Sequence, residues 1–155
     1  VIILNIEQEA QMTNVVITIV GTQRDAGGEV DSIEMMTAGR WYDKNGVRYI
    51  IYEDTNISGL EGTKTMLKLE ADQVSLVRMG EVEYRQEFCL GKKSISPYAT
   101  PYGTMQMSIE TRQLDVSLEA AGGSIYIVYD LEINGQWQSA NTLSVKVREE
   151  SKRGY

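Results

Sequence analysis

Arg78 and Glu53 are the two side chains whose type and position could do chemistry together. Residues 74–80 read Val-Ser-Leu-Val-Arg-Met-Gly, so the alternation of a β-strand places Arg78 on the same face as the first valine and the leucine. A guanidinium on an apolar strand face needs a partner or a ligand, because burying an unpaired charge costs several kcal/mol. Glu53 has the parity of the apolar odd positions in residues 47–53, so we expect it to face inward as the counter-ion of Arg78.

Other polar residues share the inward parity that the alternation predicts. The candidate ligand-binding residues of a barrel interior are Arg78, Glu53, Thr63, Thr65, Gln86, Thr111 and Tyr129, and the inward parity extends to Gln23. In the first alternative, Arg78, Tyr129 and the threonine hydroxyls hold the head of a small amphipathic anion. Guanidinium suits that task because its planar donors match an oxyanion. In this form the protein is a non-catalytic binding module.

The second alternative is a filled barrel with a structural interior. Here Arg78 pairs with Glu53, and bulky inward residues such as Trp41 and Phe88 occupy the remaining space. The protein would then act through protein association on its outer surface, and the sequence is compatible with a homo-oligomer. The least favoured alternative is an enzyme that uses Glu53 as acid or base and Arg78 as electrostatic stabiliser.

Composition narrows the remaining function classes. The chain has no histidine, which excludes imidazole metal sites and Ser-His or Cys-His nucleophiles, and it has no Gly-rich phosphate loop. We therefore expect no catalytic residues, no metal and no cofactor. A net charge of −7 disfavours nucleic acid as a partner. The single Cys89 cannot form an internal disulfide, and no apolar run is long enough for a membrane span, so we expect a cytoplasmic protein.

Alternating apolar residues recur along almost the whole chain. Turn residues such as Asp25 to Gly28, Asn45-Gly46 and Asn134-Gly135 separate the alternating segments, and no helix-period segment of useful length is present. We predict an all-β fold, a single antiparallel meander barrel of about 8–10 strands. Residues 14–148 form this barrel domain, residues 1–13 are an N-terminal extension, and residues 149–155 are a polar tail.

Two places break the alternation. Residues 91–102 contain both prolines of the chain, and we expect a mouth loop there with Tyr98, Thr100 and Tyr102. Apolar residues then change from odd to even positions near Arg112, which predicts a β-bulge because no Gly or Pro is present.

Several short motifs in this order resemble one bacterial family. They are Val-Gly-Thr-Gln at 20–23, Tyr-Ile-Ile-Tyr-Glu-Asp at 49–54, Gly-Thr-Lys-Thr at 62–65, Arg-Met-Gly at 78–80, Thr-Pro-Tyr-Gly at 100–103 and Glu-Thr-Arg at 110–112. Together they are similar to the YwiB-like proteins of unknown function. The resemblance covers residues 12–147 and implies a calycin-like barrel, as in lipocalins, in a bacterial cytosol. It implies no activity.

Overall fold

The protein consists of antiparallel β-strands. The computed structural model describes residues 12–54, 63–79 and 84–150, and these residues contain no helix. The strands are β1 (Thr13–Asp25), β2 (Val30–Lys44), β3 (Val47–Asp54), β4 (Thr63–Leu69), β5 (Gln73–Met79), β6 (Tyr84–Cys89), β7 (Lys93–Thr100), β8 (Gly103–Leu118), β9 (Gly122–Ile133) and β10 (Gln136–Glu149). The predicted all-β class is confirmed.

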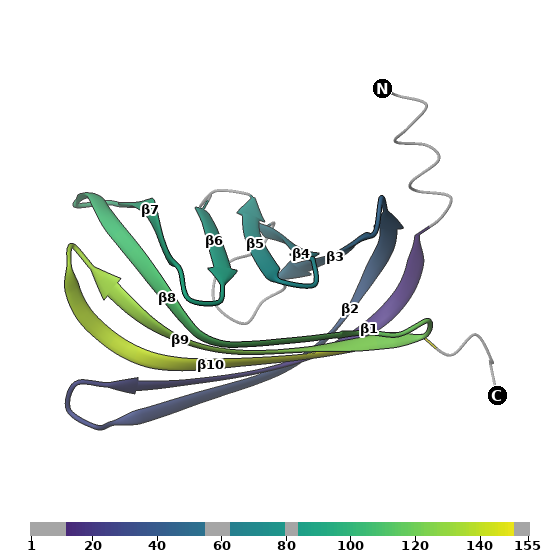
Figure 1. Cartoon of the computed structure of the whole chain (residues 1–155), viewed down its shortest axis with the longest axis horizontal. Coiled ribbons are helices and arrows are strands. Elements are labelled where there is room, and N and C mark those ends of the chain that lie inside the picture. The colour runs from purple at the N-terminus through teal and green to yellow at the C-terminus, as the bar shows by residue number, and fades with distance from the viewer. Residues whose placement is uncertain (1–11, 55–62, 80–83, 151–155) are drawn as a thin grey trace.

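The ten strands form one sheet that curves into a nearly closed barrel. Their order is β6-β5-β4-β3-β2-β1-β10-β9-β8-β7, so strands adjacent in the chain pair with each other except β6 and β7, and β1 pairs with β10. The long strands β1, β2, β8, β9 and β10 make a curved layer, and the short strands β3 to β6 lie over its concave side (Figure 1). The meander barrel predicted from the sequence is confirmed.

The first and last strands of the sheet order meet without forming a ladder. The turn after β6 contacts β8 through two long backbone hydrogen bonds. Gly91 N–H donates to the Thr111 carbonyl oxygen over 3.4 Å, and Thr111 N–H donates to that of Lys92 over 3.5 Å. We call the line between β6 and β7 the seam of the barrel.

Apolar side chains fill the space between the two layers. The largest side chains that are fully buried include Phe88 from β6, Ile17 from β1, Ile50 from β3 and Ile127 from β9. They come from both the short and the long strands, so burial of their apolar surface holds the two layers together.

The sequence predicted the wrong set of inward-facing side chains in β3. Arg48, Ile50 and Tyr52 are buried, so the even positions face inward and Glu53 is exposed on the outer face. The segment is apolar at both parities, because Tyr49 and Ile51 flank Ile50. Alternation of residue type could not choose between the two faces.

The predicted mouth loop at residues 91–102 was wrong over most of its length. Residues 93–100 form strand β7, which pairs with β8 from Lys93↔Glu110 to Thr100↔Gly103. Pro97 breaks the expected pattern because it lacks a backbone N–H, but an edge strand tolerates it. Tyr98 and Thr100 are therefore half-buried strand residues, and Tyr102 in the turn is 99% exposed.

Three other local predictions are confirmed. The pairing of β8 with β9 shifts between Thr111 and Gln113, where a bulge was expected. Asn45-Gly46 and Asn134-Gly135 have positive φ values and connect hairpins, as Asn-Gly turns do. The predicted extension at residues 1–13 and the tail at 149–155 lie almost entirely outside the described residues.

Candidate functional site

A row of polar side chains crosses the concave face of the long strands. The register pairs Thr111 of β8 with Tyr129 of β9, Tyr129 with Asn141 of β10, Asn141 with Gln23 of β1, and Gln23 with Asp31 of β2. Directly paired residues point to the same face of a sheet. Thr111 and Asn141 are only 2% and 6% exposed and Tyr129 between them is half-buried, whereas Gln23 and Asp31 toward the β2 end are exposed.

An apolar row runs beside the polar row. The register connects Leu114, Ile127, Leu143, Gly21 and Ile33 across the same five strands. Ile127 of β9 in this row is fully buried, whereas Ile33 at the β2 end is 58% exposed. A large aliphatic side chain on the concave face would normally be covered, so the exposure of Ile33 marks a part of the interior that no described residue covers.

An open hollow of about 560 Å³ lies between these two rows. Tyr129, Asn141, Gln23 and Asp31 line it from the polar row, and Leu143, Gly21 and Ile33 line it from the apolar row. In Figure 1 the β1–β2 and β9–β10 hairpins extend beyond the short strands at this end of the molecule. The volume lies in the range of small-molecule sites, which commonly measure ~300–1,000 Å³.

The deepest polar group in the hollow is Asn141. Its side-chain nitrogen donates to Ser139 Oγ over 3.0 Å and to the Ser139 carbonyl oxygen over 3.3 Å. Asn141 Oδ1 lies 3.3 Å from Ser139 Oγ and can accept further hydrogen bonds. Asn141 is therefore held in a fixed orientation by Ser139, and its Oδ1 keeps one acceptor position.

Two members of the original candidate set, half-buried Tyr129 and buried Thr111, follow Asn141 in the polar row. The Tyr129 ring packs edge-on against Phe88, with centroids 4.9 Å apart. The Thr111 hydroxyl is buried and has no hydrogen-bond partner among the described residues. Both face inward as predicted, and neither fact tests a role in ligand binding.

Arg78 faces inward but does not meet its expected partner. Its Nε donates to Thr65 Oγ1 over 3.3 Å, and Thr65 is fully buried directly across the ladder. Tyr52 follows in the same row, so Arg78, Thr65 and Tyr52 share the inner face of β5, β4 and β3. The expected pairing of Arg78 with Glu53 is ruled out because Glu53 lies on the opposite face.

Glu53 instead lines an outer hollow of about 500 Å³. It pairs across the ladder with Lys64, and Arg40 also borders this hollow. An exposed carboxylate between two cations is typical of a solvated surface, where ion pairs contribute little to stability. Glu53, the one acidic residue in the candidate set named from the sequence, is therefore not part of an inner site.

The remaining sequence candidates are dispersed. Gln86 is half-buried, and its side-chain nitrogen lies 3.8 Å from Met107 Sδ. The side chain of Thr63 lies outside what the structure describes. Thr100 Oγ1 donates to the Gly103 carbonyl oxygen over 2.6 Å and accepts from Tyr102 N–H over 3.2 Å, so it closes the β7–β8 turn. These contacts suit a rigid turn.

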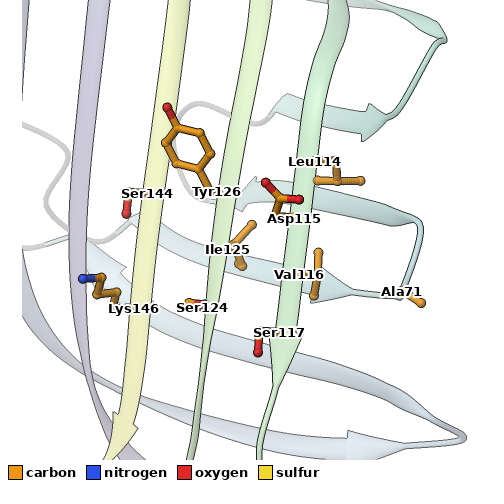
Figure 2. Close-up of a pocket in the computed structure, with 10 residues that line it drawn as sticks. All are labelled: Ala71, Leu114, Asp115, Val116, Ser117, Ser124, Ile125, Tyr126, Ser144 and Lys146. Carbon is orange, nitrogen blue, oxygen red and sulfur yellow. The ribbon is translucent and has the colours of Figure 1, made fainter.

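A further hollow of about 520 Å³ lies over β8, β9 and β10. Figure 2 shows Tyr126, Asp115 and Lys146 pointing from these strands, with Ala71 of the β4–β5 turn at the border. Asp115 and Lys146 are both exposed, and no fully buried polar group lines this hollow among the described residues. The hollow of the polar row is better built for a ligand.

The described residues contain neither a metal-binding cluster nor a membrane-spanning helix. No group of three or more Cys, Asp or Glu side chains there could hold a metal ion. No helix in the same residues is long and apolar enough to cross a membrane.

Four residues that line the hollow were not among the candidate site residues named from the sequence: Asp31, Ile33, Asn141 and Leu143. The last two have the parity of the buried Val145 in β10, so alternation could have identified them as inward. Nothing in the sequence marks the end of the barrel at which the cover is lost, because that depends on where the short strands lie.

Comparison with known proteins now gives the family. Residues 17–145 match the model of a domain of unknown function, DUF1934. The chain belongs to this family. The DUF1934 chain is 25% identical over 118 residues to the uncharacterized beta-barrel protein YwiB of Bacillus subtilis, covering 76% of this chain and 82% of YwiB.

The fold agrees with that of a solved structure. The crystal structure of the ywiB protein from Bacillus subtilis matches this DUF1934 chain with a TM-score of 0.80 at 24% identity, over 91% of this chain and 94% of that one. The family resemblance inferred from the ordered motifs is confirmed, and the barrel is the fold of both proteins.

Proposed function

We propose that this DUF1934 protein is a non-catalytic binding protein that holds a small amphipathic molecule at the open end of its concave face. The observation that carries the proposal is the hollow of about 560 Å³ between the polar row and the apolar row. One row can hydrogen-bond a head group, and the other can cover a hydrocarbon body. Sites of this kind are mostly apolar with a few placed polar groups.

Two further arguments support the proposal. The middle of the barrel is filled by buried apolar side chains, so a ligand fits best where Ile33 is exposed. The calycin-like resemblance is consistent with this role because that group includes lipid-binding barrels, although fold alone does not establish function. We place the protein in the cytosol, since its single Cys89 forms no internal disulfide.

Native mass spectrometry of the protein purified from its host tests the proposal with a variant that fills the hollow. A Cβ at Gly21 would lie 3.4 Å from Ile33 Cγ2, so Gly21→Val places methyl groups in the hollow. The φ of Gly21 is not in the left-handed region, and valine suits a strand. We expect a small-molecule adduct on the natural protein and none on Gly21→Val.

The matched control is Val20→Thr, a near-isosteric change on the opposite face of the same strand, which should retain the adduct. A clean mass for the natural protein would contradict the proposal, and so would an adduct that persists in Gly21→Val.

A second candidate site is Arg78, as the holder of an anionic head. The supporting observation is its half-buried position on the inner face beside the buried Thr65 hydroxyl, which accepts a hydrogen bond from it over 3.3 Å. Decanoate binding that disappears in Arg78→Met and persists in Gly21→Val would favour this second site. Decanoate binding unaffected by Arg78→Met would exclude it.

A further inference from the structure

We propose that the ligand of the hollow is a cationic amphipath, such as a long-chain amine, whose ammonium head lies at Asp31. This inference rests on the proposed binding function and specifies the class of ligand. It differs from the anion expected from Arg78 because the charge that lines this hollow has the opposite sign.

The charge of the hollow comes from one carboxylate. Asp31 is the single charged residue among those lining it in the described part of the chain. Gln23 and Asn141 add amide oxygens, which accept hydrogen bonds from an ammonium group. An anionic head would meet a carboxylate without a compensating cation from the lining, which is unfavourable at close range.

The surrounding charges act in the same direction. The tip of the β1–β2 hairpin, residues 24–31, carries Arg24 against the three carboxylates of Asp25, Glu29 and Asp31. Arg24 pairs with Val30 and alternates with Gln23, so it points to the outer face. The whole chain has a net charge of −7, which favours the approach of cations over anions.

Burial fixes the orientation of such a ligand. Along the polar row, exposure rises from Asn141 to Asp31, and along the apolar row it rises from Ile127 to Ile33. A charged head is least costly where it keeps contact with water, so it lies at the β2 rim beside Asp31. The hydrocarbon body then runs inward over Gly21 and Leu143, toward Ile127.

Three probes with the same chain and different heads test the inference. Decylammonium, decanol and decanoate are titrated calorimetrically into the full chain at neutral pH. The two ionic probes stay below their micelle-forming concentrations and decanol stays below its solubility limit. We expect decylammonium to bind about threefold to tenfold more tightly than decanol, and decanoate to bind most weakly. Added salt should shrink the difference between decylammonium and decanol.

Replacement of Asp31 isolates the contribution of its carboxylate to the binding of the ammonium head. Asp31→Asn keeps the size of the side chain, and the residue is exposed, so we expect folding to be unaffected. This variant should bind decanol as before and lose the preference for decylammonium. Glu34→Gln is the matched control, because Glu34 is an exposed carboxylate of the same strand on the outer face, and it should keep the preference.

The outcomes separate this inference from the proposed function. Decanoate binding as tightly as decylammonium overturns the cationic class, and so does a preference that survives in Asp31→Asn; both leave the binding function in place. Absence of binding by all three probes, together with a clean native mass, overturns the binding function and this inference with it.

Discussion

At the scale of single residues, Arg48 is a buried cation that contacts two hairpins. Its guanidinium forms a bidentate ion pair with Asp43, in which Nε and Nη2 lie 2.8 Å and 3.1 Å from the two carboxylate oxygens. Its Nη1 donates hydrogen bonds to the carbonyl oxygens of Glu119 and Gly122 over 3.0 Å each. The group also lies 3.9 Å from the centroid of the Trp41 ring. Arg48 thus joins the β2–β3 hairpin to the β8–β9 hairpin.

Replacement of Arg48 should therefore destabilise the whole barrel. Arg48→Met keeps the aliphatic stem but removes the donor to the Glu119 carbonyl oxygen, one of the two donors to that of Gly122, and the ion pair with Asp43. We expect a loss of about 2–4 kcal/mol in the free energy of unfolding. Arg48→Lys should recover only part of this loss, because an ammonium cannot reproduce the planar fork. Urea unfolding measures both variants. Equal stability of Arg48→Met and the natural protein would contradict this role.

Tyr42 makes the stability of the folded protein depend on pH in the alkaline range. Burial raises the pKa of Tyr42 above its ordinary value of 10.0, and the stacked Tyr49 raises it further. Tyr42 thus contributes stability that is fully present below pH 10 and is lost as the pH rises through the folded-state pKa.

The Tyr42→Phe variant should consequently gain stability relative to the natural protein as the pH is raised from 9 to 11, a range spanning the ordinary tyrosine pKa near 10. Unfolding midpoints in urea measured across this range test the expectation. Tyr102→Phe serves as the control, because Tyr102 is 99% exposed and its removal should leave the pH dependence unchanged. If the unfolding midpoints of Tyr42→Phe and the natural protein differ by the same amount at every pH, the expected role of Tyr42 is contradicted.

At the scale of elements, the turn of β2 from the long layer toward the short strands depends on Gly39. The register continues without a bulge from Val15 through Gly39 to Tyr52, so this glycine serves for close approach of the neighbouring strands. A Cβ at this position would lie 2.6 Å from Ile17 Cδ1 and 2.7 Å from the Ile51 carbonyl oxygen. Any side chain would force β1 and β3 away from β2.

Gly39→Ala should accordingly be destabilising by about 1–3 kcal/mol, as overpacking in a core is. Thermal and urea unfolding give the measurement. Gly27→Ala is the matched control, because a Cβ there would meet only Asp25 Oδ1 at 3.5 Å, and we expect little change. A neutral Gly39→Ala would mean that the backbone of β1 or β3 moves aside at no cost.

At the scale of the whole molecule, the seam between β6 and β7 divides the barrel into regions of different stability. Strands β1 and β10 are paired on both sides, whereas β6 and β7 each lack a partner on one side of the sheet order. Edge strands expose backbone N–H groups and open with less loss of contact.

Hydrogen exchange should follow that division. We expect the amides of β7 to exchange faster than those in the central part of β1 and β10, through local opening that leaves the long layer paired. Exchange measured by mass spectrometry at several denaturant concentrations resolves the two classes. Equal protection of β7 and β10 would indicate that the barrel opens only as a unit.

The amino-acid sequence by itself determined the class and the order of the fold. Alternation placed most strands, Asn45-Gly46 and Asn134-Gly135 set two hairpins, and the parity change near Arg112 located the bulge, because these are local consequences of backbone geometry. The ordered motifs also gave the family. The prediction that a side chain faces inward was correct in strands where only one set of alternating positions is clearly apolar, as for Thr65 and Tyr129.

Only the tertiary structure decided the site. The orientation of Glu53 depends on which face of an apolar segment is covered by the other layer, and the exposure of Ile33 depends on where the short strands end. The polar row exists because register aligns Thr111, Tyr129 and Asn141 from three successive strands with Gln23 of β1, which is distant from them in the chain. Burial and register are relations between elements, so residue types along one strand cannot specify them.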